Sequence, residues 1–169
     1  VQTTFKLANS KILKHVGRNP NDKGMGCTAE LLAFSRGSFI IGHVGDSRTY
    51  RLKKNRLQQL TKDHSLVQEQ VDKGLITAEE ARRHAMRNVI LRAVGVNDKV
   101  ALDILKGKKK SGDLFLLCSD GLTDMVEESS VLSTLSTNTS LRERSDSLIQ
   151  LAKQAGGKDN VTVVLSAVA

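Results

Sequence analysis

Aromatic residues are scarce in this chain: they make up 3% of its 169 residues, with no Trp and a single Tyr. The core is therefore expected to consist of Leu, Val, Ile and Ala rather than of stacked rings. The same shortage argues against a nucleic-acid partner, because single strands are bound by aromatic side chains set among basic ones. Lys and Arg exceed Asp and Glu by 26 to 18, but they are scattered. The one tight basic run, residues 106–110, is interpreted as a solvated loop before the turn at Ser111-Gly112-Asp113.

Cysteine and long apolar runs are equally scarce. Cys27 and Cys118 lie far apart in apolar surroundings, so we expect two buried free thiols in a reducing compartment. No Cys/His spacing suggests zinc. The apolar runs are far shorter than a membrane span, and no signal peptide is recognisable. The chain opens on Val1 without an initiator Met, which predicts a processed chain or a fragment of a longer protein.

The spacing of the apolar residues predicts a mixture of helices and strands. Strands joined by tight turns are expected over residues 27–61, a half-buried strand over 99–106, a strand covered on both faces over 113–119 and a closing strand over 160–168. Helices are expected over residues 1–17, 66–74, 77–85, 127–136 and 140–155. Residues 88–95 are apolar and ambiguous.

This order of elements lacks strict βαβ alternation. It indicates an α+β fold, with largely antiparallel sheets and helices packed outside them. A doubly wound parallel sheet is the alternative. The length fits one domain over residues 1–169.

Three acids share one context at the ends of apolar strands. Asp46 follows the strand "FIIGHVG", Asp120 follows "LFLLCS", and Asp159 precedes "VTVVLSAV". Carboxylates on rigid strand ends are suited to Mg²⁺ and Mn²⁺, which prefer oxygen ligands, and such a like-charged cluster would need a cation. However, Asp beside Gly is also a common turn element. Spacing alone leaves the metal site and the simple turn both open.

Six motifs in order carry a family resemblance. They are "GMGCT" (24–28), "GHVGDSRTY" (42–50), "LTKDHSLVQEQVDKGLITAEEA" (60–81), "LRAVG" (91–95), "GDLFLLCSDGLTDMV" (112–126) and "GGKDNVTVV" (156–164). Together they resemble the metal-dependent serine/threonine protein phosphatases of the type 2C class (PPM type), in their compact bacterial form. The resemblance covers nearly all of the chain from Gly24 onward.

The resemblance implies a fold and a chemistry. The fold is a β-sandwich of two antiparallel sheets flanked by helices, with the family's N-terminal strands absent from this chain. The activity is hydrolysis of phosphoserine or phosphothreonine in proteins by a metal-activated water, without a covalent phospho-enzyme. The cofactors are two Mn²⁺ or Mg²⁺ ions in the complete domain, with a third, weaker ion beside them.

The resemblance also implies roles for individual residues. Asp120 and Asp159 are the catalytic metal ligands, Asp46 joins Asp120 at the third metal, and Asp124 lies near that third site, through water. Three residues would support these ligands: Ser119, Gly121 and Asn160. Asp63, His64 and Ser65 open a mobile flap, where a structural role for His64 is preferred over that of a catalytic acid. His43 is expected to be a core or lining residue, and Gly24 and Gly26 to allow a close backbone approach.

One family segment has no counterpart here. The Asp-Gly-x-Gly-Gly-His motif, whose Asp bridges the two metals in the family, occurs nowhere in the sequence. The chain is therefore expected to be the C-terminal two-thirds of a phosphatase domain, with impaired metal binding and turnover by itself. A non-catalytic pseudo-phosphatase or regulatory module of the same fold is the alternative.

The remaining expectations concern the cellular setting. The implied partners are phosphorylated proteins, substrates of a Ser/Thr kinase, with no nucleic acid and no membrane span. A monomer is expected. The cytoplasm is the expected compartment, because bacterial relatives usually work beside a transmembrane Ser/Thr kinase.

Overall fold

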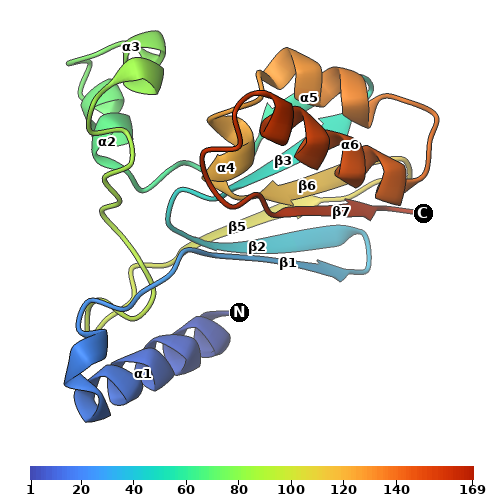
Figure 1. The fold of residues 1–169 in the computed structure, drawn as a ribbon. Helices are drawn as coiled ribbons and strands as arrows, with labels where there is room; N and C mark the ends of the chain where they lie inside the picture. Colours follow the sequence, from blue (N-terminus) through green and yellow to red (C-terminus); the bar gives the residue numbers. More distant parts are fainter. The chain divides into compact units, whose positions relative to one another are not determined.

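The computed structural model describes residues 1–169, which form two compact units (Figure 1). The first comprises Val1–Asp46 and Lys62–Gly107, and the second comprises Ser47–Thr61 and Lys108–Ala169. Each unit has its own sheet and its own helices, and both sheets contain antiparallel strand pairs. The predicted α+β class with two antiparallel sheets and flanking helices is confirmed. The doubly wound parallel alternative is wrong.

The first unit contains a three-stranded sheet in the order β1-β2-β5. Its elements are α1 (Gln2–Arg18), the 3-10 helix η1 (Pro20–Asp22), β1 (Ala29–Ser35), β2 (Ser38–Val44), α2 (Leu66–Asp72), α3 (Ala78–Arg83) and β5 (Asp103–Lys108). A two-residue turn at Arg36-Gly37 joins β1 to β2, with Gly37 at φ +66. Phe5 of α1 packs with Val44 and Val94 in the core of this unit.

Helices α2 and α3 lie side by side in a segment that we call the helical arm, residues 65–90 (Figure 1). Ser65 caps α2, and Thr77 forms the predicted capping box with Glu80 at the start of α3. The base of the arm is closed by backbone pairing on both sides of a bridge between Ser65 and Ile90. There the N–H of Leu66 donates to the carbonyl of Val89 at 2.9 Å. The two ends of the arm are therefore held together.

The second unit contains a four-stranded sheet in the order β4-β3-β6-β7. Its elements are β3 (Arg48–Lys53), β4 (Arg56–Gln59), β6 (Leu114–Cys118), α4 (Asp120–Thr123), α5 (Glu128–Leu135), α6 (Leu141–Gln154) and β7 (Val163–Ala167). Its core comprises Tyr50, Leu114, Leu116, Cys118, Leu122, Val126, Val131, Leu135, Leu148 and Ala152. As predicted, β6 is buried along almost its whole length, because it is a central strand under helices.

Two sequence-based expectations about local structure are wrong. Cys27 is exposed, since it precedes β1 and joins Val94 only by an isolated bridge; Cys118 is buried as predicted. The predicted strand over 99–106 is displaced toward the C-terminus and includes part of the basic run. It keeps Leu105 half-buried and leaves Ile104 exposed, while Gly107 lies against the Phe39 ring. Lys106 and Lys108 lie on the exposed face of this strand, where their charges remain in contact with water, so the basic residues are compatible with a strand.

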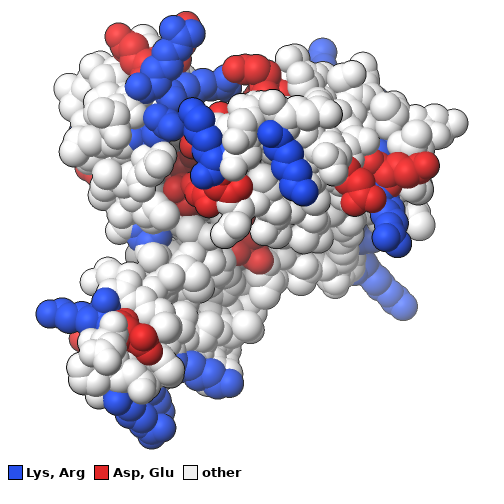
Figure 2. All heavy atoms as spheres, viewed as in Figure 1, with Lys and Arg blue, Asp and Glu red and all other residues white.

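The basic side chains are scattered over the surface, as they are scattered along the sequence. On the face shown in Figure 2, Lys and Arg are dispersed among neutral residues rather than gathered into one patch. No helix of the chain is long and apolar enough to cross a membrane.

Candidate functional site

The end of β6 presents Asp120 as the sequence predicted. The strand ends at Cys118, and Asp120 is the first residue of the one-turn helix α4. Its side chain is held locally, since Oδ1 accepts a hydrogen bond from the N–H of Gly121 at 2.8 Å. Asp120 is half-buried, whereas Asp124, the residue that ends α4, is exposed. A rigid, buried strand therefore carries this carboxylate to the edge of the unit.

Asp120 lies in a negative electrostatic environment. Burial raises its pKa first, and the charges of Asp124 and Asp159 raise it further, against a lowering by the Gly121 hydrogen bond. The structure therefore brings Asp120, Asp124 and Asp159 into one electrostatic neighbourhood of the second unit. A positive charge placed there would be favourable for all three carboxylates.

Ser119 connects the end of β6 to the loop that carries Asp159. Its hydroxyl donates to the carbonyl of Asn160 at 3.2 Å and accepts from the N–H of Thr162 at 3.0 Å. Its own N–H donates to the carbonyl of Thr162 at 3.2 Å. Three hydrogen bonds from one residue thus set the distance between the two predicted ligand positions.

Gly121 allows the same loop to approach closely. A Cβ atom at this position would lie 2.3 Å from the carbonyl oxygen of Asn160, well inside contact distance. The close neighbour of Gly121 is therefore the Asn160 backbone. Asn160 in turn reaches Asp159 through its backbone N–H, which donates to Asp159 Oδ1 at 2.6 Å.

Asp159 does not lie directly on a core strand, contrary to expectation. It is exposed and precedes β7, which begins only at Val163. No three His, Cys, Asp or Glu side chains of the chain converge into a ready-made ligand group. The donor type nevertheless fits a hard cation, because the grouped side chains offer carboxylate oxygens only.

Asp46 belongs to the first unit, where it is buried with 8% of its surface exposed. It follows Gly45, whose φ of +116 and close approach to Thr28 leave no room for a side chain. The chain therefore turns at Gly45, directly before Asp46. The grouping of Asp46 with the acids of the second unit stays a prediction.

A polar network in the first unit was not predicted from the sequence. His43 lies fully buried in β2, where Nδ1 bonds Glu30 on β1 and Nε2 contacts the Lys62 carbonyl at 2.8 Å. Its ring lies 4.4 Å from that of His64, which in turn contacts Asp103. Glu30 raises the pKa of His43 although burial alone would lower it. His43 is thus a hydrogen-bonded core residue, as expected, but with partners that the sequence analysis missed.

The flap residues have clear positions within the first unit. Ser65 caps α2, and its hydroxyl accepts from the N–H of Gln68 at 3.3 Å. Asp63 is half-buried and His64 is buried, both directly before the helical arm. His64 has several hydrogen-bond partners in this environment, and its structural rather than catalytic role stays a prediction.

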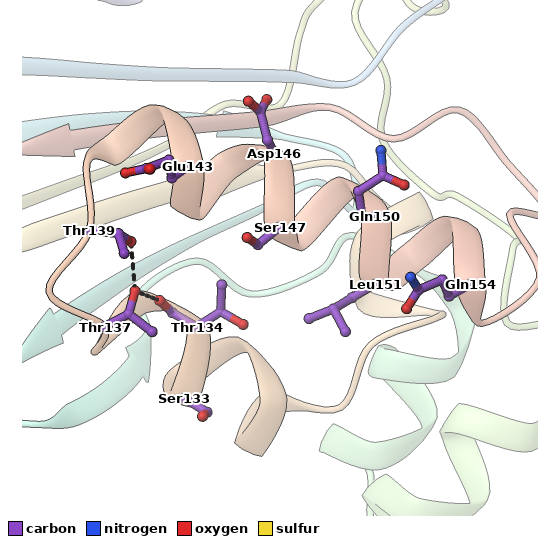
Figure 3. Close-up of a pocket in the computed structure, with 10 residues that line it drawn as sticks. All are labelled: Ser133, Thr134, Thr137, Thr139, Glu143, Asp146, Ser147, Gln150, Leu151 and Gln154. Atoms are coloured by element: carbon purple, nitrogen blue, oxygen red, sulfur yellow. Dashed lines mark hydrogen bonds between the residues drawn. The ribbon is translucent and has the colours of Figure 1, made fainter.

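A hollow between α5 and α6 lies apart from every predicted site residue of the second unit (Figure 3). Hydroxyl, amide and acidic side chains line it, and many are engaged with near neighbours. Thr137 bonds the carbonyl of Thr134 and the hydroxyl of Thr139, each at 2.9 Å, and Glu143 closes the capping box of α6. This hollow is therefore a surface feature of the helix pair.

The antiparallel sheets, the flanking helices and the acids beside β6 define a phosphatase-like α+β protein. The family model described as "Protein phosphatase 2C" matches residues 4–158. The chain belongs to the protein phosphatase 2C family, which confirms the resemblance inferred from the motifs.

Individual relatives agree with this assignment. The serine/threonine phosphatase Stp of Listeria welshimeri is 41% identical over 157 residues, covering 93% of this chain and 62% of the relative. The structure of the phosphatase Stp1 from Staphylococcus aureus is 35% identical with a TM-score of 0.94, covering 99% of this chain and 66% of that one. The catalytic domain of the phosphatase PstP, solved with two manganese ions, is 39% identical with a TM-score of 0.85, covering 93% and 65%. The chain thus spans just under two thirds of these relatives' length.

Proposed function

We propose that this chain belongs to a metal-dependent phosphatase that hydrolyses phosphoserine and phosphothreonine in cytoplasmic phosphoproteins, the substrates of a Ser/Thr kinase. The observation that carries the proposal is the group of Asp120, Asp124 and Asp159 beside β6, in a family whose relatives are serine/threonine phosphatases. A solved relative, the catalytic domain of PstP in complex with two manganese ions, supports a divalent cation as the cofactor.

The residues of the chain have distinct parts in this proposal. Asp120 and Asp159 would hold the catalytic cations, with Asp46 and Asp124 at a third, weaker ion. A bound Mn²⁺ or Mg²⁺ supplies a water of lowered pKa and neutralises negative charge on the phosphoryl group. Ser119, Gly121 and the backbone of Asn160 keep the two ligand positions at a fixed separation, so that little reorganisation accompanies binding.

We further propose that residues 1–169 form one functional domain, a monomer, but turn over slowly by themselves. They supply several of the acids but lack the Asp-Gly-x-Gly-Gly-His segment that carries the bridging acid in the family. A cation would then have fewer anionic ligands and weaker affinity.

Hydrolysis of a phosphothreonine peptide with Mn²⁺ tests the proposal. The 169-residue chain should be slow, and a version extended upstream by an Asp-Gly-x-Gly-Gly-His segment should be faster by orders of magnitude. In the extended protein, Asp120→Asn should abolish activity, because a neutral amide is a poor ligand for a hard cation.

The matched control is Asp146→Asn, which removes an exposed carboxylate of α6 outside the group. It should leave activity unchanged. Retained activity in Asp120→Asn would refute the assignment, and full activity of the chain alone would refute the impairment. If the extended protein neither binds Mn²⁺ in calorimetry nor hydrolyses the peptide, the non-catalytic regulatory module is correct.

A further inference from the structure

His64 connects three separate segments of the first unit. Its N–H donates to the carbonyl of Gly45 at 2.7 Å, and its own carbonyl accepts from the N–H of Leu91 at 2.7 Å. Its ring contacts Asp103 at the start of β5. The side chain is only 6% exposed, so these contacts form with little competition from water. His64 therefore joins the end of β2 to the base of the helical arm and to β5.

The partners of the ring determine where its proton lies. The N–H of Gly45 donates to Nδ1 at 3.1 Å. A backbone amide can only donate, so Nδ1 must be the unprotonated nitrogen of a neutral imidazole. The proton then lies on Nε2, which is 3.2 Å from Asp103 Oδ2 and can donate to this carboxylate. Arg92 Nη1 also lies 3.2 Å from Nε2, but the N–H of Gly45 can only donate, so this tautomer is the one that gives Nδ1 a hydrogen-bond partner.

The charged groups around the ring favour the same neutral form. Burial lowers the pKa of His64 first, and the charges of His43 and Arg92 lower it further, while Asp103 acts in the opposite direction. Arg92 Nη1 bonds the other oxygen of Asp103 at 3.1 Å, so that carboxylate is shared between the guanidinium and the imidazole. The negative charge of Asp103 is thereby partly balanced without protonation of the ring.

The main consequence of this arrangement falls on Gly45. Both of its backbone polar groups are bonded to His64, the carbonyl to the main chain and the N–H to the ring. On its other side, Thr28 lies so close that a Cβ atom would be 2.4 Å from the Thr28 methyl carbon. With φ at +116, this glycine is fixed from two sides in a conformation that other residues avoid. Asp46 is the next residue, and it is buried.

We propose that His64 is a positioning residue for Asp46: as the Nε2-protonated tautomer it fixes both backbone groups of Gly45 and links this turn, through Leu91, to the base of the helical arm. The assignment of Asp46 to a metal rests on the proposed function; the fixing of Gly45 by His64 does not. Displacement of the arm base would move Gly45 and, with it, the Asp46 carboxylate.

The tautomer can be measured on the unaltered 169-residue chain. The four histidines are few enough to assign by ¹⁵N NMR with single variants. We expect His64 at neutral pH to show an unprotonated Nδ1 coupled to the Gly45 amide proton and a protonated Nε2. A protonated Nδ1 would overturn the proposal without any variant.

Paired variants separate the ring's two contacts. In His64→Asn, the side-chain oxygen takes the place of Nδ1 and can still accept from Gly45; in His64→Gln, the polar atoms lie further out, toward Asp103. Hydrogen exchange of the Gly45 amide should stay near the original rate in His64→Asn and become about tenfold faster in His64→Gln. Equal exchange in both variants would overturn the proposal. Asp103→Asn, which leaves Nδ1 untouched, should preserve Gly45 protection.

Addition of Mn²⁺ separates the positioning of Gly45 by His64 from the assignment of Asp46 to a metal. Broadening of the Asp46 amide signal should require several-fold more Mn²⁺ in His64→Gln than in His64→Asn. If Mn²⁺ never broadens this signal in the unaltered protein while the tautomer and the Gly45 exchange are as expected, positioning by His64 is upheld and the metal assignment of Asp46 fails.

Discussion

At the residue scale, Ser119 and Gly121 hold the end of β6 against the loop that carries Asp159. Asp120 could be predicted because an apolar run ends abruptly in a Ser-Asp-Gly sequence, a pattern local to a few residues. The three hydrogen bonds of Ser119 could not be predicted, since they reach a loop more than 40 positions away. Such a contact depends on tertiary packing, for which short-range patterns contain no information.

Gly121 provides the first prediction at this scale. Gly121→Ala should destabilise the protein by about 1–3 kcal/mol, because the new Cβ meets a backbone carbonyl that cannot rotate away. Gly17→Ala is the control, since Gly17 lies in α1 with no atom within 4 Å of an added Cβ. It should stabilise by up to about 1 kcal/mol through helix propensity. Urea unfolding measures both, and shifts of the same sign would contradict the account.

Asp113 provides the second prediction, with a pH dependence. Burial alone would raise its pKa, but hydrogen bonds from Arg51 and from the Lys110 N–H, with the charge of Arg51, lower the pKa overall. A lowered native pKa means that this stabilisation is present above the unfolded pKa and is lost as the pH falls through the native pKa. Asp113→Asn should therefore cost about 3 kcal/mol at neutral pH, where a buried charge loses its partner.

The difference in unfolding free energy between Asp113→Asn and the original protein should become smaller at acidic pH. Unfolding free energies from pH 7 down to pH 3 test this, with Asp146→Asn, an exposed acid, as a control of near-zero effect. A destabilisation that stays constant over this range would show that the carboxylate charge is not responsible. The sequence analysis interpreted Asp113 only as part of a turn, since its partner lies 62 positions earlier.

At the element scale, the hairpin illustrates what a local pattern can and cannot predict. Strands joined by tight turns were expected over residues 27–61, and the two-residue turn at Arg36-Gly37 places Glu30 opposite His43. The register of the two strands therefore predicts the buried Glu30–His43 pair. Strand β5 was misplaced for a different reason: alternation at Val100, Leu102 and Ile104 suggested one face, whereas pairing with β2 begins only at Asp103.

Tyr50 tests the packing of β3 against the helices of the second unit. Burial raises the pKa of this phenol to about 12, while Arg48 acts in the opposite direction. It is the only Tyr, and there is no Trp, so the ultraviolet absorbance of the phenolate reports on this one side chain. A midpoint near pH 12 is expected, with a return to about 10 in denaturant. A native midpoint near 10 would contradict the burial.

The sign of the linked stability effect follows from the same shift. Because the native pKa of Tyr50 is raised, its contribution is fully present below about pH 10 and is lost as the pH rises through about 12. The unfolding free energy of Tyr50→Phe should therefore fall less steeply with increasing pH than that of the original protein. This comparison separates titration of Tyr50 from general alkaline unfolding.

At the scale of the whole molecule, family membership rests on ordered motifs that run through both compact units. The matched residues 4–158 include elements of each unit, so both sheets are part of the family's fold. What the sequence could not predict is the state of the acid group itself. Burial and the charges of Asp124 and Asp159 raise the pKa of Asp120, yet no three His, Cys, Asp or Glu side chains of the chain form a ligand group.

The most direct test of the central claim is a Mn²⁺ titration of the 169-residue chain followed by amide line broadening in NMR. The account predicts that the signals of Asp120, Asp124 and Asp159 broaden first, and that Asp120→Asn needs at least about tenfold more Mn²⁺ for the same effect, because a neutral amide binds hard cations weakly. Broadening that begins elsewhere, such as at the exposed acids of α6, or that is unchanged by Asp120→Asn, would contradict the claim that these carboxylates bind the metal.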